Sequence, residues 1–369
     1  MPKPKPQKNR RPAISMGVEL ETYSIALPEY RICRELHFPK RSIVEKGERF
    51  TRDWSIGSEY NSKVFTTIRE SLFLLKSSLR KYTEFRPKSN SKDHHVIFPI
   101  GGWTNRFAGS HIHLAFGKRK LKYTEARSLA ACLHDHIPFL MVLSENSPVW
   151  QGKITRCSSN RLLLASDKYC KVTKLGSLYK HHFRELSFNR GGKKKPPTLE
   201  LRICDSSLPE YLAAILCICR AVALRWVKRK YALKHSTHPN YLKARDQAIR
   251  SGLKAKLVWN NHWLHVSDYV DLFFRKYEDE LDKMDIPDEV IRVFKYLKKG
   301  WNQAEVIKRA AIRCRRERRL AWQRQFARRY AVAIQELLDG NSYEQFARRL
   351  GVTLPNIDRV WLGRKGANW

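Results

Sequence analysis

The chain has 369 residues, with 72 Lys and Arg against 35 Asp and Glu, and a formal net charge of +37. Its 42% hydrophobic and 11% aromatic content excludes a disordered chain and predicts one large domain plus a smaller one. An excess of cations this large creates a positive potential that attracts nucleic acid, nucleotides or anionic surfaces, with simple solubility as the alternative.

Residues 1–12, MPKPKPQKNRRP, lack the apolar core of a secretory signal and predict a flexible basic arm. The eight cysteines form no CxxC pair, which favours reduced, buried thiols in a cytoplasmic protein. The most apolar run, LAAILCICRAVAL, is too short to span a bilayer and is interrupted by Arg220. We therefore expect no membrane partner.

Apolar periodicity predicts strands and helices in irregular alternation along the rest of the chain. Strands are expected at 13–24, 95–100, 110–116 and 197–205. Helical patterns cover 62–83, 123–143, 208–235, 241–300 and, with many arginines, 303–338. This order predicts an α+β fold, with a mainly antiparallel sheet and helices packed on one side of it.

Three of the expected strands carry two polar residues on one face, because residues i and i+2 of a strand point the same way. The pairs are Glu19 and Glu21 in GVELE, His111 and His113 in GSHIHLAFG, and Glu200 and Arg202 in LELRICD. Glu59 follows the turn-like DWSIGS, where Asp53 suits a structural turn. A solvated sheet face explains any one pair, but the set forms a constellation of carboxylates and imidazole that suits Mg²⁺ or Mn²⁺.

These segments, in their order and approximate spacing, resemble motifs of the carboxylate–amine ligases with a glutamine-synthetase-like fold. The resemblance is to the glutamate–cysteine ligase type 2 and amidoligase families, and it covers residues 14 to 230. LSENSPVWQGKITRCSSNR, residues 143–161, is similar to a segment that those ligases carry between the histidine strand and the Glu-x-Arg strand.

The resemblance implies an ATP-dependent ligase. Such enzymes convert a carboxylate into an acyl phosphate, which an amine attacks to give an amide, with release of ADP and phosphate. Relatives often form symmetric assemblies, so the resemblance also allows a homo-oligomer. The resemblance implies metal binding by Glu19, Glu21, Glu59, His111 and Glu200, a place for His113 near the nucleotide phosphates, and contacts of Arg202 and Arg161 with the transferred phosphoryl group.

Two features depart from the relatives, and two assignments keep alternatives. Position 115 is Ala where relatives often place Gly, and the loop before Glu200 contains three lysines, 193–195. Those lysines form either an ordinary solvated loop or a contact for a polyanionic substrate. Asp205 either orients Arg202 or caps a turn.

The tail SYEQFARRLGVTLPNIDRVWLGRKG, residues 342–366, resembles the helix-turn-helix of bacterial and phage DNA-binding proteins. A second helix is expected at 355–362. The resemblance implies that Asn356 and Arg359 face the major groove and that Arg348, Arg349, Arg364 and Lys365 meet phosphates. A helical hairpin used only for packing is the alternative. Trp322, Phe326 and Tyr330 are expected to form the packing face for this motif.

The sequence thus predicts a basic arm (1–12), a ligase-like catalytic domain (13–300) and an arginine-rich, helix-turn-helix-like nucleic-acid-binding segment (301–369). Residues 301–369 carry a net charge of +9 and the remainder +28, so the ligase part is basic too. The leading hypothesis is an ATP- and Mg²⁺-dependent ligase that acts on, or is tethered to, nucleic acid. The alternatives are a catalytically silent nucleic-acid-binding protein with a ligase scaffold and a Zn²⁺ hydrolase using His111 and His113.

Overall fold

The computed structural model describes residues 14–33, 47–53, 56–85, 94–117, 120–169, 185–192, 195–229 and 235–363. The predicted arm 1–12 lies outside the described residues, as do Arg364 and Lys365 of the predicted nucleic-acid contacts. Among the described helices, none combines the length and the hydrophobicity that a transmembrane span requires.

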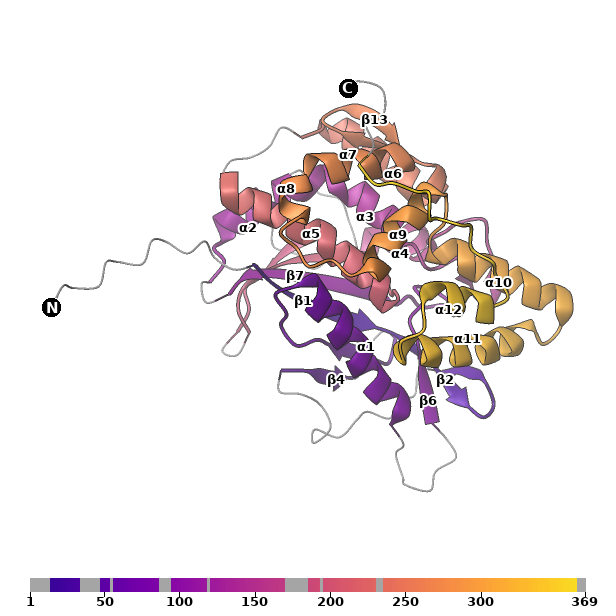
Figure 1. Cartoon of the computed structure of the whole chain (residues 1–369). Coiled ribbons are helices and arrows are strands. Elements are labelled where there is room, and N and C mark those ends of the chain that lie inside the picture. Colours follow the sequence, from indigo (N-terminus) through magenta and orange to yellow (C-terminus); the bar gives the residue numbers. More distant parts are fainter. Residues whose placement is uncertain are drawn as a thin grey trace.

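A six-stranded sheet, antiparallel throughout, forms the centre of the molecule (Figure 1). In sheet order its strands are β10 (Leu186–Asn189), β11 (Thr198–Asp205), β7 (Gly109–Phe116), β1 (Ile14–Glu21), β5 (Glu59–Asn61) and β4 (Arg49–Thr51). The predicted α+β class with a mainly antiparallel sheet is therefore confirmed.

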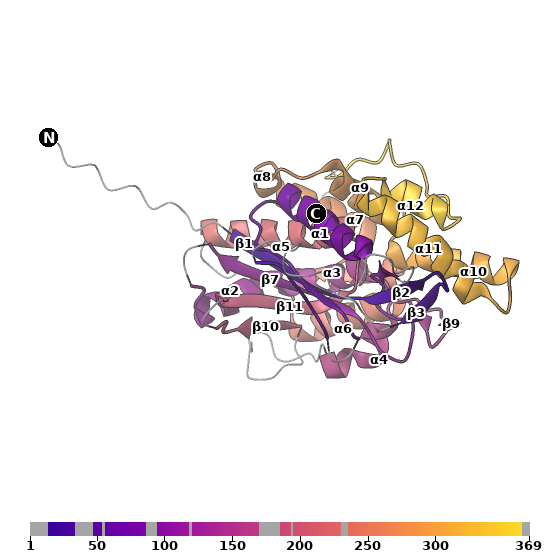
Figure 2. The same cartoon turned by 90° about the horizontal axis from the view of Figure 1, so that it is seen from below.

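The two faces of this sheet differ in chemistry. On β1, Met16, Val18 and Leu20 are buried in the core, whereas Glu19 and Glu21 alternate with them and stay partly exposed. Helices α1 (Ile68–Glu84), α3 (Ile137–Ser144) and α5 (Pro209–Arg229) belong to that core, and Figure 2 shows α1 and α5 running along one face of the strands. The opposite face is left for polar side chains.

A second sheet of three strands continues from the end of β1. Its order is β3 (Arg31–Cys33), β2 (Tyr23–Leu27) and β6 (His94–Phe98). Helix α11 (Trp322–Leu338) packs on this sheet, where Phe326 stacks on Trp103 with ring centroids 5.0 Å apart and Tyr330 meets Phe98 edge-on at 4.6 Å. The predicted aromatic stripe is thus a packing face, shared between the sheet region and α12 (Tyr343–Arg349), whose Phe346 contacts Tyr330.

The predicted second helix of the helix-turn-helix is wrong. After α12 and the turn at Gly351, the chain up to residue 363 contains no helix. Asn356 accepts a hydrogen bond from the backbone N–H of Asp358 at 2.8 Å, so the side chain closes a local turn in competition with helix formation. The expected core residues of the tail are nevertheless buried, among them Val352, Ile357 and Val360.

The remaining elements are mostly helices, with two short β-hairpins among them. The predicted helix 123–143 is divided by a 3₁₀ turn, and 241–300 contains a β-hairpin that the sequence analysis read as helix. The arginine-rich pattern 303–338 is two helices. The elements are α2 (Tyr123–Leu133), η2 (His134–His136), β8 (Val149–Trp150), β9 (Lys153–Ile154), α4 (Asn160–Tyr169), α6 (His238–Ser251), η3 (Gly252–Lys254), β12 (Lys256–Trp259), β13 (His262–His265), α7 (Val266–Lys276), α8 (Glu278–Leu281), α9 (Asp288–Lys298) and α10 (Gln303–Glu317).

Candidate active site

Strand register brings the predicted polar residues together on one face of the central sheet. Between β1 and β7, Glu19 lies opposite His111; between β1 and β5, Glu21 lies opposite Glu59. On the next strand, β11, Glu200 lies opposite His113 of β7. Four strands from distant parts of the chain therefore contribute to a single site.

His111 lies at the centre of this site and is buried. Its Nδ1 is 3.5 Å from Glu19 Oε2 and 3.7 Å from Glu200 Oε1, and its Nε2 is 3.9 Å from Glu21 Oε1. The imidazole, on β7, thus connects carboxylates of the two neighbouring strands β1 and β11.

The ligand-type atoms form two clusters, each with its atoms within 4.8 Å of one another. One contains Glu19, His113 and Glu200; the other contains Glu21, Asp53 and Glu59. Asp53, which the sequence analysis assigned to turn structure, also fulfils that role, because its Oδ1 accepts from the backbone N–H of Ile56 at 2.8 Å. The only indication of this ligand role in the sequence is the position of Asp53, a carboxylate six residues before Glu59.

The donor set suits divalent cations. Distances of 3.5 to 3.9 Å around His111 and Glu19 are at or beyond the limit of a hydrogen bond, and they are short enough for a shared cation to draw the ligand atoms together. His113 Nε2 is buried without a hydrogen-bond partner among the described residues, 3.5 Å from Glu19 Oε2, while its Nδ1 is held by Thr198 Oγ1 at 2.9 Å. That arrangement orients the free nitrogen toward the first cluster.

The carboxylates differ in their electrostatic surroundings. Burial alone would raise the pKa of Glu19, but the adjacent imidazoles of His111 and His113 outweigh it and lower the pKa below the usual range. For Glu200, burial is again opposed, and outweighed, by His113 and Arg202, so its pKa is lowered. At Glu59 burial dominates and, with the charges of the neighbouring carboxylates, raises the pKa.

Cationic side chains border the first cluster. Arg202 donates a short hydrogen bond to Glu200 and keeps 23% of its side chain exposed. Lys195, 70% exposed, places Nζ 3.6 Å from Glu19 Oε1. Of the three loop lysines, Lys195 is therefore at the site, whereas Lys193 and Lys194 lie outside the described residues.

Arg161 lies in the core beneath the site. It is buried and donates to the carbonyl oxygens of Arg202 at 3.0 Å and Ile203 at 3.2 Å, where the register of β11 shifts. Neither expectation for Asp205 describes its carboxylate, which accepts from Ser147 and Ser159 at 2.7 and 3.0 Å. The segment 143–161 is thereby fixed to the strand that carries Glu200 and Arg202.

A scan against protein-family models and a search of curated proteins gave no match. Solved structures do match across nearly the whole chain. The complex between the prokaryotic ubiquitin-like protein Pup and its ligase PafA aligns with a TM-score of 0.58 and 11% identity, over 92% of this chain and 80% of that one. The chain has the fold of the carboxylate–amine ligases.

Two further structures share this ligase fold. A bifunctional glutathione synthetase from Pasteurella multocida aligns with a TM-score of 0.57 and 12% identity over 92% of this chain, which spans 55% of that protein. Glutamate–cysteine ligase from Francisella tularensis, in complex with AMP, aligns with a TM-score of 0.54 and 12% identity, over 93% of this chain and 92% of that one.

Proposed function

We propose that this protein is an ATP- and Mg²⁺-dependent carboxylate–amine ligase. The observation that carries the proposal is the pair of ligand clusters on either side of His111, on the polar face of a sheet with the ligase fold. Structures with this fold were determined with AMP and with ADP. A scaffold without turnover has no physical need to gather five carboxylates and two imidazoles against their mutual repulsion.

The first cluster, Glu19, His113 and Glu200, and the second cluster, Glu21, Asp53 and Glu59, would hold the divalent ions. When bound, such ions neutralise the triphosphate and stabilise the charge on the transferring oxygens. Mn²⁺ accepts the same ligands.

The proposed reaction has two steps. An oxygen of the substrate carboxylate attacks the γ-phosphorus of ATP, ADP leaves, and an acyl phosphate forms. The amine nitrogen then attacks the acyl carbon, phosphate leaves, and the nitrogen loses its proton. Arg202, oriented by Glu200, and the exposed Lys195 lie where they could neutralise phosphoryl oxygens, whereas Arg161 acts as a positioning residue through the β11 backbone.

The second part of the proposal is that the ligase acts on, or is tethered to, nucleic acid. It is supported by the net charge of +37, of which +28 lies outside residues 301–369. The acceptor or donor is then a modified base, a tRNA or a bound protein.

The decisive measurement is Mg²⁺-dependent release of ADP and phosphate from ATP, with pooled amino acids and with or without nucleic acid. Release that rises with one pool is expected for wild type, and Glu21→Gln and Glu200→Gln should reduce it at least about 100-fold without unfolding the protein. Glu29→Gln, an exposed carboxylate in the β2–β3 turn, is the control. No release under any condition from folded wild type would overturn the ligase proposal and favour the silent scaffold.

A further inference from the structure

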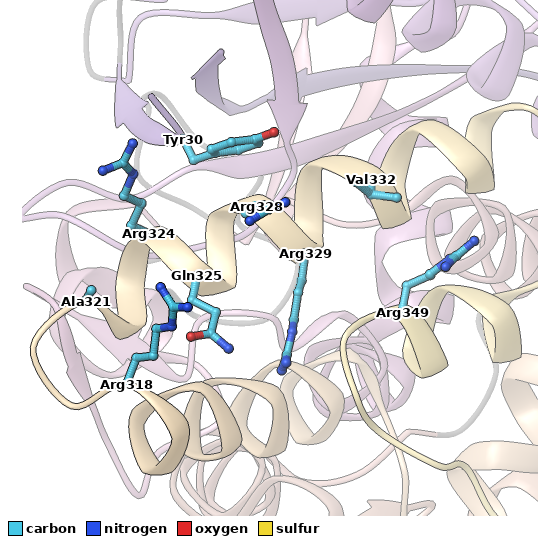
Figure 3. A pocket seen from close by; sticks show the side chains of 9 residues that line it. All are labelled: Tyr30, Arg318, Ala321, Arg324, Gln325, Arg328, Arg329, Val332 and Arg349. Carbon is cyan, nitrogen blue, oxygen red and sulfur yellow. The ribbon is translucent and has the colours of Figure 1, made fainter. Parts of the chain in front are cut away.

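An arginine-lined groove crosses helix α11, away from the ligand clusters. It has a volume of about 540 Å³ and five arginines among its lining residues. Figure 3 shows Tyr30 on one side of α11 and Arg318 and Arg349 on the other. We refer to Tyr30, Arg318, Arg324, Arg328, Arg329 and Arg349 as the arginine groove.

Most of the charge in this groove is not neutralised by the protein. Residues 313–329 contain eight arginines and one carboxylate, Glu317. Arg329 pairs with Glu317 at 2.7 Å. Arg318, Arg324 and Arg328 are exposed and form no ion pair with a carboxylate among the described residues. Guanidinium groups left in this state attract phosphate, which they can bind through two parallel hydrogen bonds.

A second basic pocket adjoins the groove. It has a volume of about 510 Å³ and is lined on the α10 side by Arg315, Arg316 and Arg319. Arg318 lines the groove and Arg319 lines this pocket, so both reach the connection between α10 and α11. Two basic pockets at this one connection offer more cationic surface than a single phosphate needs, which favours a polyanion over a small anion.

Tyr30 adds an aromatic ring to this cationic surface. It lies in the turn between β2 and β3, half-buried, with the Arg328 guanidinium 5.9 Å above its ring. A basic groove with an aromatic ring is the combination that binds single-stranded nucleic acid, since phosphates meet the cations and bases stack on the ring. An acidic peptide carries no bases to stack on the ring, so the tyrosine favours nucleic acid.

We propose that the arginine groove is the binding site for a single strand of nucleic acid. This inference rests on the nucleic-acid part of the proposed function and replaces the helix-turn-helix tail as the binding surface. Tyr30 follows Glu21 by nine residues, which span at most about 32 Å. A base stacked on Tyr30 is therefore within about that distance of Glu21 in the second cluster.

The test uses the full chain and a fluorescently labelled oligothymidylate or oligouridylate of about 16 nucleotides. Affinity is measured by anisotropy over a range of salt concentrations for wild type and for the triple variant Arg318→Gln, Arg324→Gln, Arg328→Gln. Three lost phosphate contacts should weaken binding at least about tenfold and reduce the slope of log affinity against log salt by about 2. Tyr30→Leu should weaken binding roughly 5- to 100-fold with the slope retained.

The matched control removes the same charge elsewhere. Arg127, Arg229 and Arg250 are exposed arginines outside the groove, and their triple change to Gln should leave affinity within about threefold of wild type. Equal losses in both triple variants would overturn the proposal and leave only general charge attraction. Unchanged affinity in the groove variant, stronger binding of duplex than of single strand, or equal competition by polyglutamate would overturn it too.

The ligase proposal is assessed separately. ADP release without nucleic acid should be unchanged in the groove variants, because no groove residue belongs to the ligand clusters. A protein that binds oligonucleotide through the groove but releases no ADP contradicts the ligase proposal alone. A protein that releases ADP but does not bind the oligonucleotide contradicts the proposed nucleic-acid site alone.

Discussion

His136 is buried between α2 and α3, far in sequence from the tyrosines that bind it. Tyr269 donates its hydroxyl to a backbone carbonyl, so His136 Nδ1–H donates to the Tyr269 oxygen at 2.9 Å, and the Tyr277 hydroxyl donates to Nε2 at 3.0 Å. Both ring nitrogens are satisfied in the neutral form. Burial, with the nearby charges of Arg225 and His134, lowers the pKa of His136 to about 3.

Because His136 is held neutral, we expect the free energy of unfolding to fall in acid. In the unfolded chain it takes up a proton below pH ~6.5, whereas in the native state it stays neutral until pH falls to about 3. Native stability is therefore complete above the unfolded pKa and is lost as pH falls through this window, by about 1 kcal/mol per pH unit from this group. Urea unfolding between pH ~7 and ~4 should show a flatter dependence in His136→Gln than in wild type. The exposed control His262→Gln should keep the wild-type slope, and parallel curves for all three proteins would contradict the assignment.

At the scale of the strand, Gly109 at the start of β7 lies close to both Glu21 of the second cluster and the buried Arg161. Its N–H donates to Glu21 Oε2 at 2.6 Å, and a Cβ at this position would lie 2.5 Å from Arg161 Nη2. Arg161 is held by two carbonyl oxygens and cannot move without releasing them. Gly109→Ala should therefore cost about 1–3 kcal/mol of stability and lower ADP release by roughly 10- to 100-fold.

Gly17 of β1 is the matched control for this strand. A Cβ there would meet its neighbours at ordinary distances, 3.7 Å from Ser62 Oγ and 4.0 Å from His113 Cβ. Gly17→Ala is expected to stay within about 0.5 kcal/mol of wild type in urea unfolding. If both alanine variants behave alike in unfolding and in ADP release, the close packing of Gly109 on Arg161 does not position the site.

Helix α12 is predicted to stabilise the fold rather than to read bases. Phe346 is buried against Tyr330 and Tyr343, with ring centroids 5.4 and 6.0 Å apart. Phe346→Ala should lower the free energy of unfolding by about 3–5 kcal/mol, whereas Trp361→Ala, which removes a 63% exposed ring, should cost less than about 1 kcal/mol. Thermal unfolding and oligonucleotide anisotropy distinguish the roles. A folded Phe346→Ala protein of normal stability with lost affinity would restore the tail as the binding surface.

Strands in which polar and apolar residues alternate could be predicted from the sequence. Turns set by the backbone conformation or the side-chain hydrogen bond of one or two residues could not. Alternation on three strands assigned six site residues to one face, but only strand register shows which of them pair. The hairpin β12–β13 turns at Asn260 and Asn261, both with positive φ, a turn signal hidden between two short strands. The second tail helix was predicted from apolar spacing, and the side chain of Asn356 overrides that spacing.

At the scale of the whole molecule, the affinity for nucleic acid has two sources, the net positive charge and the contacts in the arginine groove. Residues outside 301–369 carry +28, so the groove variant keeps a strongly positive surface and residual affinity for polyanions. Each phosphate contact contributes to the salt dependence, so the variant with fewer contacts loses affinity more slowly as salt rises. The affinity gap between wild type and the triple variant should therefore narrow by roughly 20-fold between about 50 and 200 mM salt. A gap that is constant across this range, measured by anisotropy, would mean that the three arginines do not contact phosphates, and that the charge of the ligase part alone attracts the strand.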